Sequence, residues 1–179
     1  LPPVPGRRTI AGSVPDMSAL TVKDVGCMID RDRFRDALAA WASGVTVVAC
    51  RNDERVIATT VSSFMSLSLD PPLILAAIGP NATVRPFLVP GQAFAVSILS
   101  SAQRRLAMVF ADPLPVGADP FPSDGAPVVE GCLLGLECVV ERVDDGGDHA
   151  IVIASVRDAV RGAGVPLIRY NRGYHVLDG

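Results

Sequence analysis

The chain has 179 residues, enough for one domain, and its 49% apolar and 20% charged residues exclude intrinsic disorder for the body of the chain. Its 16 glycines and 15 prolines, against six Phe, two Tyr and one Trp, favour many short elements over a helical bundle. A net charge of −3, with Lys23 as the only lysine, argues against a nucleic-acid-binding face, and no apolar run reaches the length of a membrane span.

Residues 1–26 are rich in Pro, Gly and Ser and lack apolar periodicity. We therefore expect a flexible N-terminal tail over residues 1–29 and a single domain over residues 30–179. The beginning of the chain lacks the charged-then-apolar order of a signal peptide, which favours a cytoplasmic protein.

The first expected element is a helix that begins at Asp30 or Asp32, carries Phe34, Leu38 and Trp41 on one face, and ends before position 44. The β-branched run 45–50 predicts a strand, and the polar residues 51–54 predict a hairpin turn into a second strand over 55–61.

A polar connection over 62–69 is expected next, followed by a buried strand over 73–78. Asn81 could open a short helix that Pro86 limits, and the period-two pattern over 93–98 predicts a strand. Ser100 and Gln103 form the pattern of a capping box, which predicts a helix that presents Phe110 on its apolar side. The five prolines within residues 112–127 indicate a loop.

Two long strands are expected over 133–143 and 149–156, joined by a glycine-containing turn at 144–148. Short strands at 167–170 and 174–177 bring the count to seven or eight, which indicates a mainly β protein, a barrel or a sandwich with a few helices. No glycine motif for a dinucleotide or a phosphate loop is present.

Side chains for hydrolytic or metal chemistry are scarce. His149 and His175 are the only histidines and have no third partner nearby, so no metal site is predicted. No serine lies in a nucleophile elbow, and the spacing of Cys27, Cys50 and the two later cysteines favours buried free thiols. A bound cofactor that carries the difficult step fits this composition best.

One polar cluster is dense, and it lies where a strand runs out into a loop. Its members are Thr59, Thr60, Ser62, Ser63, Ser66 and Ser68. Small hydroxyls can edge a planar ring and bind a phosphate without adding charge. The alternative is a turn stabilised by local side-chain to backbone hydrogen bonds.

Several segments, in this order, carry a family resemblance: Gly44-Val45-Thr46-Val47-Val48, Thr60-Val61-Ser62-Ser63-Phe64, Ser66-Leu67-Ser68-Leu69-Asp70-Pro71-Pro72, Gly125-Ala126-Pro127, Gly147-Asp148-His149 and Arg172-Gly173-Tyr174. From about Phe34 to Leu177 the chain resembles the flavin reductase family. The resemblance implies an antiparallel, Greek-key-like FMN-binding split barrel. It also implies a homodimer that reduces FMN or FAD with NADH or NADPH, often for a separate monooxygenase.

The resemblance also implies site residues. His149 matches the histidine at the nicotinamide side and is the expected catalytic residue. The residues expected to bind flavin or to close over it are Thr59, Thr60, Val61, Ser62, Ser63, Ser66, Ser68, Asn81, Thr83, Phe110, Arg172 and Tyr174. Ala58 replaces a usual glycine, and the segment 79–83 lacks the usual basic or serine residue, so flavin is expected to bind loosely, as a substrate would.

The residues alone leave other interpretations open. His149 could be a strand-end histidine bonded to hairpin backbone, although it shares a strand face with Ile151 and Ile153. Tyr174 could be a core aromatic with an exposed hydroxyl. The alternatives to a reductase are a flavin- or haem-binding electron carrier and a structural or regulatory dimer.

Overall fold

The structure is a computed structural model and describes residues 29–53, 55–113 and 119–177. The chain divides into two units, one ending at Ala37 and one beginning at Leu38. The predicted tail lies outside the described residues except for Ile29. The description below concerns the second unit, apart from the helix that crosses the boundary.

That helix is α1 (Arg31–Leu38). Asp30 is its N-cap, because its Oδ1 accepts from the backbone N–H groups of Asp32 and Arg33 at 3.1 and 2.9 Å. The helix is shorter than predicted, and Trp41 lies outside it. The carbonyl of Ala39 accepts a hydrogen bond from the N–H of Asn171, at 2.8 Å, and not one from a following turn of the helix. The chain therefore leaves helical geometry there.

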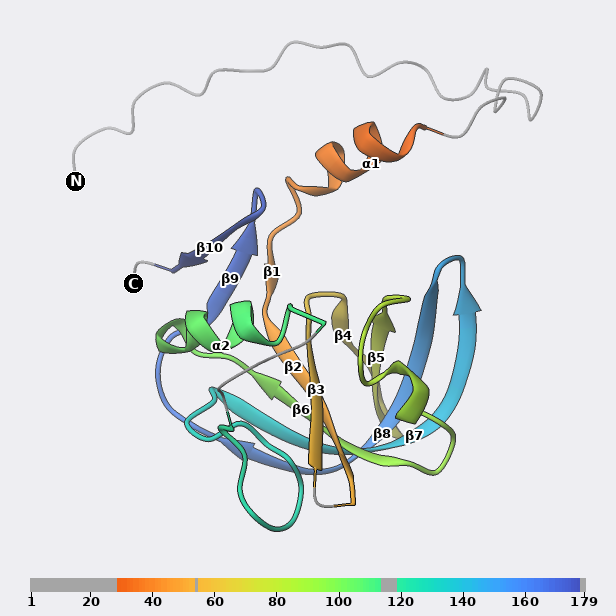
Figure 1. The fold of residues 1–179 in the computed structure, drawn as a ribbon, viewed down its shortest axis with the longest axis vertical. Coiled ribbons are helices and arrows are strands. Elements are labelled where there is room, and N and C mark those ends of the chain that lie inside the picture. The colour runs from red at the N-terminus through yellow and green to blue at the C-terminus, as the bar shows by residue number, and fades with distance from the viewer. Residues whose placement is uncertain (1–28, 54, 114–118, 178–179) are drawn as a thin grey trace. The chain divides into compact units, whose positions relative to one another are not determined.

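Strands dominate the second unit and are all antiparallel in their pairings (Figure 1). They are β1 (Ser43–Gly44), β2 (Thr46–Asn52), β3 (Arg55–Val61), β4 (Phe64–Leu69), β5 (Pro72–Ile78), β6 (Ala93–Ile98), β7 (Leu134–Gly146), β8 (His149–Arg161), β9 (Leu167–Tyr170) and β10 (Gly173–Val176). Seven form one sheet in the order β3-β2-β6-β7-β8-β5-β4, and three form a second in the order β1-β9-β10. The mainly β class is as predicted, with ten strands in the described ranges where seven or eight were expected.

Both predicted hairpins are confirmed. Thr46 pairs with Val61 in the first, and Gly146 pairs with His149 in the second. The second turn is tighter than the predicted 144–148, because β7 continues to Gly146 and only two residues remain between the strands. Gly147 has φ +72°, a conformation that glycine adopts without strain.

The segment 62–69 was predicted as a polar connection, which is wrong. Phe64–Leu69 forms β4, which pairs with β5 from Phe64–Ala76 to Leu69–Pro72. The serines concealed a period-two alternation in which Ser66 and Ser68 lie between Met65, Leu67 and Leu69. β4 is an edge strand of the large sheet, and so is β3.

The remaining helices are short: η3 (Arg85–Phe87), η4 (Ser101–Gln103) and α2 (Arg104–Val109). The prediction that Asn81 caps this short helix is wrong, because the cap position of η3 is Val84. Pro86 lies in the first turn of η3, where its missing N–H costs no hydrogen bond. The capping box of Ser100 and Gln103 is confirmed. None of the helices in the described ranges has the length and apolar character needed to cross a membrane.

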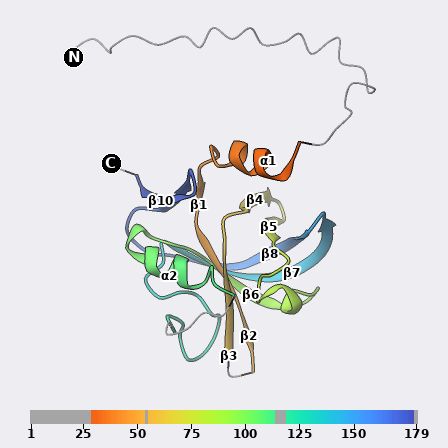
Figure 2. The same cartoon turned by 45° about the horizontal axis from the view of Figure 1, so that its top comes forward.

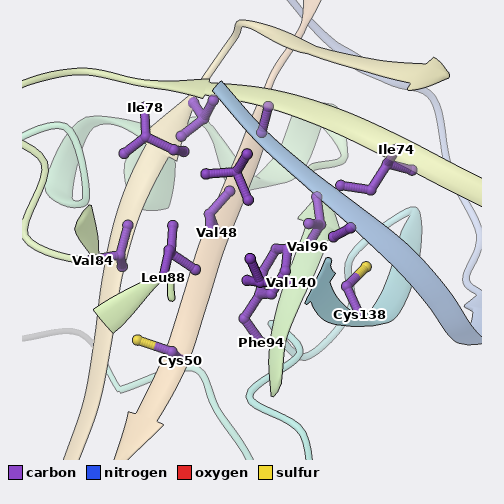
Figure 3. Packing of buried hydrophobic residues seen from close by; sticks show 14 of the residues in the cluster. Val48, Cys50, Ile74, Ile78, Val84, Leu88, Phe94, Val96, Cys138 and Val140 are labelled. Atoms are coloured by element: carbon purple, nitrogen blue, oxygen red, sulfur yellow. The ribbon is translucent and has the colours of Figure 1, made fainter. Parts of the chain in front are cut away.

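Two buried clusters lie on opposite faces of the strands, because β2 is buried on both sides. In the first cluster Val48, Phe94 and Val140 point toward one another from β2, β6 and β7 (Figure 3). In the second, Val47 and Ala49 pack with Ala107 and Phe110, which α2 and its C-terminal end provide. This second cluster fixes α2 against the sheet beside the end of β3.

Cys50, Cys132 and Cys138 are buried free thiols, as predicted, and Cys27 lies outside the described residues. Burial raises the pKa of Cys50 to about 11 and the pKa of Cys138 to about 12, and it also raises that of Cys132. The thiolate is the reactive form, so these thiols stay protonated and unreactive at neutral pH.

We expect a Cys27→Ser variant to incorporate no iodoacetamide at pH 8 while folded, and to be labelled at all three remaining thiols in guanidinium chloride. Mass spectrometry of the intact protein measures this directly. Labelling of the folded protein at Cys50 or Cys138 would contradict the burial of these side chains.

Candidate functional site

A cavity of about 400 Å³ lies where the chain leaves β3 and enters β4. Its lining is formed by Thr59, Thr60, Val61, Ser62, Ser63, Ala77, Gly79, Pro80, Asn81, Ala82, Phe110, Ala111, Asp112, Pro113 and His149. Most of these side chains are small and uncharged. The cavity is thus large enough and neutral enough for a planar polar ring.

Thr59 ties one side of the cavity to the segment before η3. The hydroxyl of Thr83 donates to the carbonyl of Ala58 at 3.0 Å, and the hydroxyls of Thr59 and Thr83 lie 2.9 Å apart. Because the Thr83 proton is used on Ala58, the Thr59 hydroxyl donates to Thr83. These bonds hold the residues around Asn81 at the edge of the cavity.

Thr60 ties the other side of the cavity to α2. Its hydroxyl donates to the carbonyl of Ala107 at 2.8 Å, and its N–H donates to the carbonyl of Phe110 at 2.9 Å. Phe110 is 4% exposed, and its ring centroid lies 5.5 Å from that of Phe121. Adjacent strand residues point to opposite faces, so Thr59 and Thr60 anchor two different walls.

His149 enters the cavity from the first position of β8. Its Nδ1 lies 2.6 Å from the Oδ1 of Asp148, and the guanidinium of Arg85 donates to the Asp148 carbonyl at 2.8 Å. The carboxylate oxygen accepts a hydrogen bond from the Nδ1–H, which leaves Nε2 on the side of Gly79. A Cβ added at Gly79 would lie 3.5 Å from Nε2. The ring is therefore oriented by Asp148, with its free nitrogen at the cavity wall.

The cavity brings together eight of the predicted residues: Thr59, Thr60, Val61, Ser62, Ser63, Asn81, Phe110 and His149. Ser66 and Ser68 lie on β4 outside this lining, and Thr83 lies behind Thr59. Arg172 is in the turn between β9 and β10, with φ +61°, and Tyr174 is on β10. The roles assigned to these thirteen residues stay predictions.

Sequence reasoning missed several residues of the lining and its border. Ala77, Ala82 and Ala111 have no chemical signature in a sequence, and only the fold reveals them. Arg85 is different, because it is a cation close to the segment 79–83, where no basic residue had been found. Among the described residues, no group of three His, Cys, Asp or Glu side chains is arranged to hold a metal ion.

The chain is similar to a family of known proteins. The model of the flavin reductase like domain matches residues 38–178. The reductase component of 4-hydroxyphenylacetate 3-monooxygenase from Thermus thermophilus is 38% identical over 152 residues, which are 82% of this chain and 97% of that protein. An NADH-dependent FAD reductase from Streptomyces globisporus is 37% identical over 141 residues, with 74% and 77% covered.

A solved structure agrees with these relatives. The flavin reductase of styrene monooxygenase from Pseudomonas putida has a TM-score of 0.74 and 30% sequence identity, with 81% of this chain and 97% of that chain covered. Sequence and fold thus point to the same group of proteins, over the unit that contains the cavity.

Proposed function

Because the chain belongs to the flavin reductase family, we propose that the cavity at the end of β3 binds a flavin and a reduced pyridine nucleotide together. The enzyme is a flavin reductase that uses NADH or NADPH to reduce FMN or FAD. When bound, the flavin supplies the hydride-accepting ring. The observation that carries the proposal is a largely uncharged, hydroxyl-edged cavity with one carboxylate-oriented imidazole in its wall.

The chain's own residues position the reactants and supply no acid–base machinery. Hydride transfer depends chiefly on holding two rings in register, and a rigid cavity provides that proximity. Thr59 to Ser63 offer hydroxyls and backbone groups to the polar edge of a flavin, and Phe110 forms an apolar wall. Nε2 of His149 is available to the carboxamide of the nicotinamide.

The phosphate of the flavin is expected at the segment that contains Asn81. Arg85 follows this segment, and its guanidinium bonds the Asp148 carbonyl at the cavity border. The segment 79–83 alone had favoured a protein that binds flavin without reductase activity. Arg85 supplies the missing positive charge, so no observation now favours the electron-carrier alternative.

One sample tests the proposal. The purified protein is titrated with FMN and FAD while flavin fluorescence is recorded, and NADH and NADPH oxidation is then followed with each flavin. We expect binding of at least one flavin and turnover with at least one nucleotide. A protein that binds neither flavin and oxidises neither nucleotide overturns the proposal, whereas tight flavin retention without turnover indicates an electron carrier.

We also propose a homodimer, with β4 at its interface. Met65, Leu67 and Leu69 are 53%, 42% and 90% exposed on this edge strand. An edge strand that exposes apolar side chains is an association surface unless something covers it, and a second copy of the chain offers the same surface by symmetry. The partner monooxygenase and a cytoplasmic location, which suits free thiols and NADH, belong to the same proposal.

A charge at the centre of β4 is expected to dissociate this dimer. Leu67→Asp would place an unpaired carboxylate in the interface, and we expect the dimer dissociation constant to rise at least about 100-fold. Analytical ultracentrifugation measures it. Val160→Asp, at an exposed position of β8, is the matched control and should leave the dimer intact. A Leu67→Asp protein that sediments as the wild type would remove β4 from the interface.

A further inference from the structure

Two arginine side chains lie over one tyrosine ring beside α2. Arg169 on β9 pairs directly with Tyr174 on β10 in the antiparallel register, so the two side chains share a face of the small sheet. The Cζ of Arg169 is 4.9 Å from the ring centroid, and the Cζ of Arg104, from α2, is 6.0 Å from it. Figure 1 shows β9 beginning beside the helical segment that contains Arg104, and Figure 2 shows β10 above α2.

These two guanidinium groups have no carboxylate partner in the described part of the chain. The ion pairs found there are Arg142 with Asp144, Arg157 with Glu141, and His149 with Asp148. Two like charges that share one ring repel each other, and an anion placed between them or beside them relieves this repulsion. The planar forks of arginine match the oxygen geometry of phosphate groups.

The arginine pair is attached to the cavity through α2. The hydroxyl of Tyr174 donates to the carbonyl of Ala107 at 3.5 Å, and the hydroxyl of Thr60, which lines the cavity, donates to the same carbonyl at 2.8 Å. Thr59 faces the opposite wall, where Thr83 and the segment leading to Arg85 lie. Outside the lining of the cavity, one arginine thus lies on the Asp148 side and two lie behind the α2 wall.

We propose that Arg104 and Arg169, mounted on Tyr174, bind the pyrophosphate of an adenine dinucleotide. The reduced pyridine nucleotide is the first source of this group, because the flavin phosphate already has the Arg85 side, and FAD is the second. The inference rests on the proposed function, in which both nucleotides occupy the cavity. It assigns to α2 and β9 a second anion site.

Binding of ADP-ribose, which has the pyrophosphate but no nicotinamide, tests the site without turnover. By isothermal titration calorimetry on the flavin-free protein, we expect Arg104→Gln and Arg169→Gln each to weaken ADP-ribose about tenfold. Arg169→Lys should lose less, because it keeps the charge and loses only the fork. Arg105→Gln, on the same helix but without contact to the ring, should bind as the wild type does. Unchanged binding of both ADP-ribose and FAD in the two ring variants overturns the proposal.

Turnover separates this inference from the proposed function. With FMN as acceptor, the KM for NADH should rise about tenfold in Arg169→Gln, while turnover of dihydronicotinamide riboside, which has no phosphate, should stay unchanged. A wild-type protein that fails with the riboside and with NADH alike refutes the reductase itself. If Arg169→Gln impairs turnover of NADH and of the riboside equally, the arginine has a structural role and the proposed anion site is overturned. Loss confined to FAD, with FMN, NADH and ADP-ribose unaffected, assigns the pyrophosphate to the flavin.

Discussion

Replacement of His149 by alanine is expected to slow hydride transfer by about 10- to 100-fold and to change the dissociation constant for flavin by no more than about threefold. The ring forms one wall of the cavity, whereas the hydroxyls of β3 form another. Removing the imidazole therefore leaves the flavin contacts and frees the nicotinamide to take unproductive positions. Anaerobic stopped-flow measurements give the rate, and flavin fluorescence gives the affinity.

Asp148 provides a matched second variant. Asp148→Asn keeps the shape of the side chain but removes the carboxylate that lies 2.6 Å from Nδ1 of His149. The imidazole can then adopt the other tautomer or rotate, so we expect a smaller loss of rate than in His149→Ala and again little change in flavin binding. Equal losses of rate and flavin affinity in His149→Ala would show that the histidine is a structural residue of the hairpin.

The hairpins were predictable because their signals are local. A β-branched run, a polar turn and a second apolar run specify β2 and β3 without any knowledge of the rest of the fold. The same holds for the glycine turn before His149. β4 was missed for a local reason too: its alternation sets serine against methionine and leucine, and serine is read first as a turn residue.

The walls of the cavity were not predictable from local patterns. Thr60 reaches Ala107 across 47 positions, and Tyr174 reaches the same carbonyl across 67 positions. Ala107 takes part in both contacts through its backbone carbonyl alone, so its residue type does not indicate either contact. The family resemblance pointed to the end of β3, which lines the cavity, but only the fold brings α2 and β10 close to that strand.

The cavity itself is tested most directly by filling it. In Ser63→Trp, an indole replaces a hydroxymethyl group in the lining, and Ser63 is exposed, so the larger side chain meets space and not the core. We expect flavin affinity to fall at least about 100-fold while the free energy of unfolding changes by less than about 1 kcal/mol. Flavin fluorescence titration measures the first quantity and urea denaturation the second.

The control for this variant is Asn52→Trp, which adds the same ring at the exposed end of β2, in the hairpin at the opposite end of β3 from the cavity. It should bind flavin as the wild type does. Because both substitutions enlarge an exposed polar residue of the β2–β3 hairpin or the segment that follows it, a difference between them reports on the cavity and not on the hairpin. Normal flavin binding in Ser63→Trp would therefore show that the flavin lies elsewhere, and the roles given to Thr59, Thr60 and His149 would then fail together.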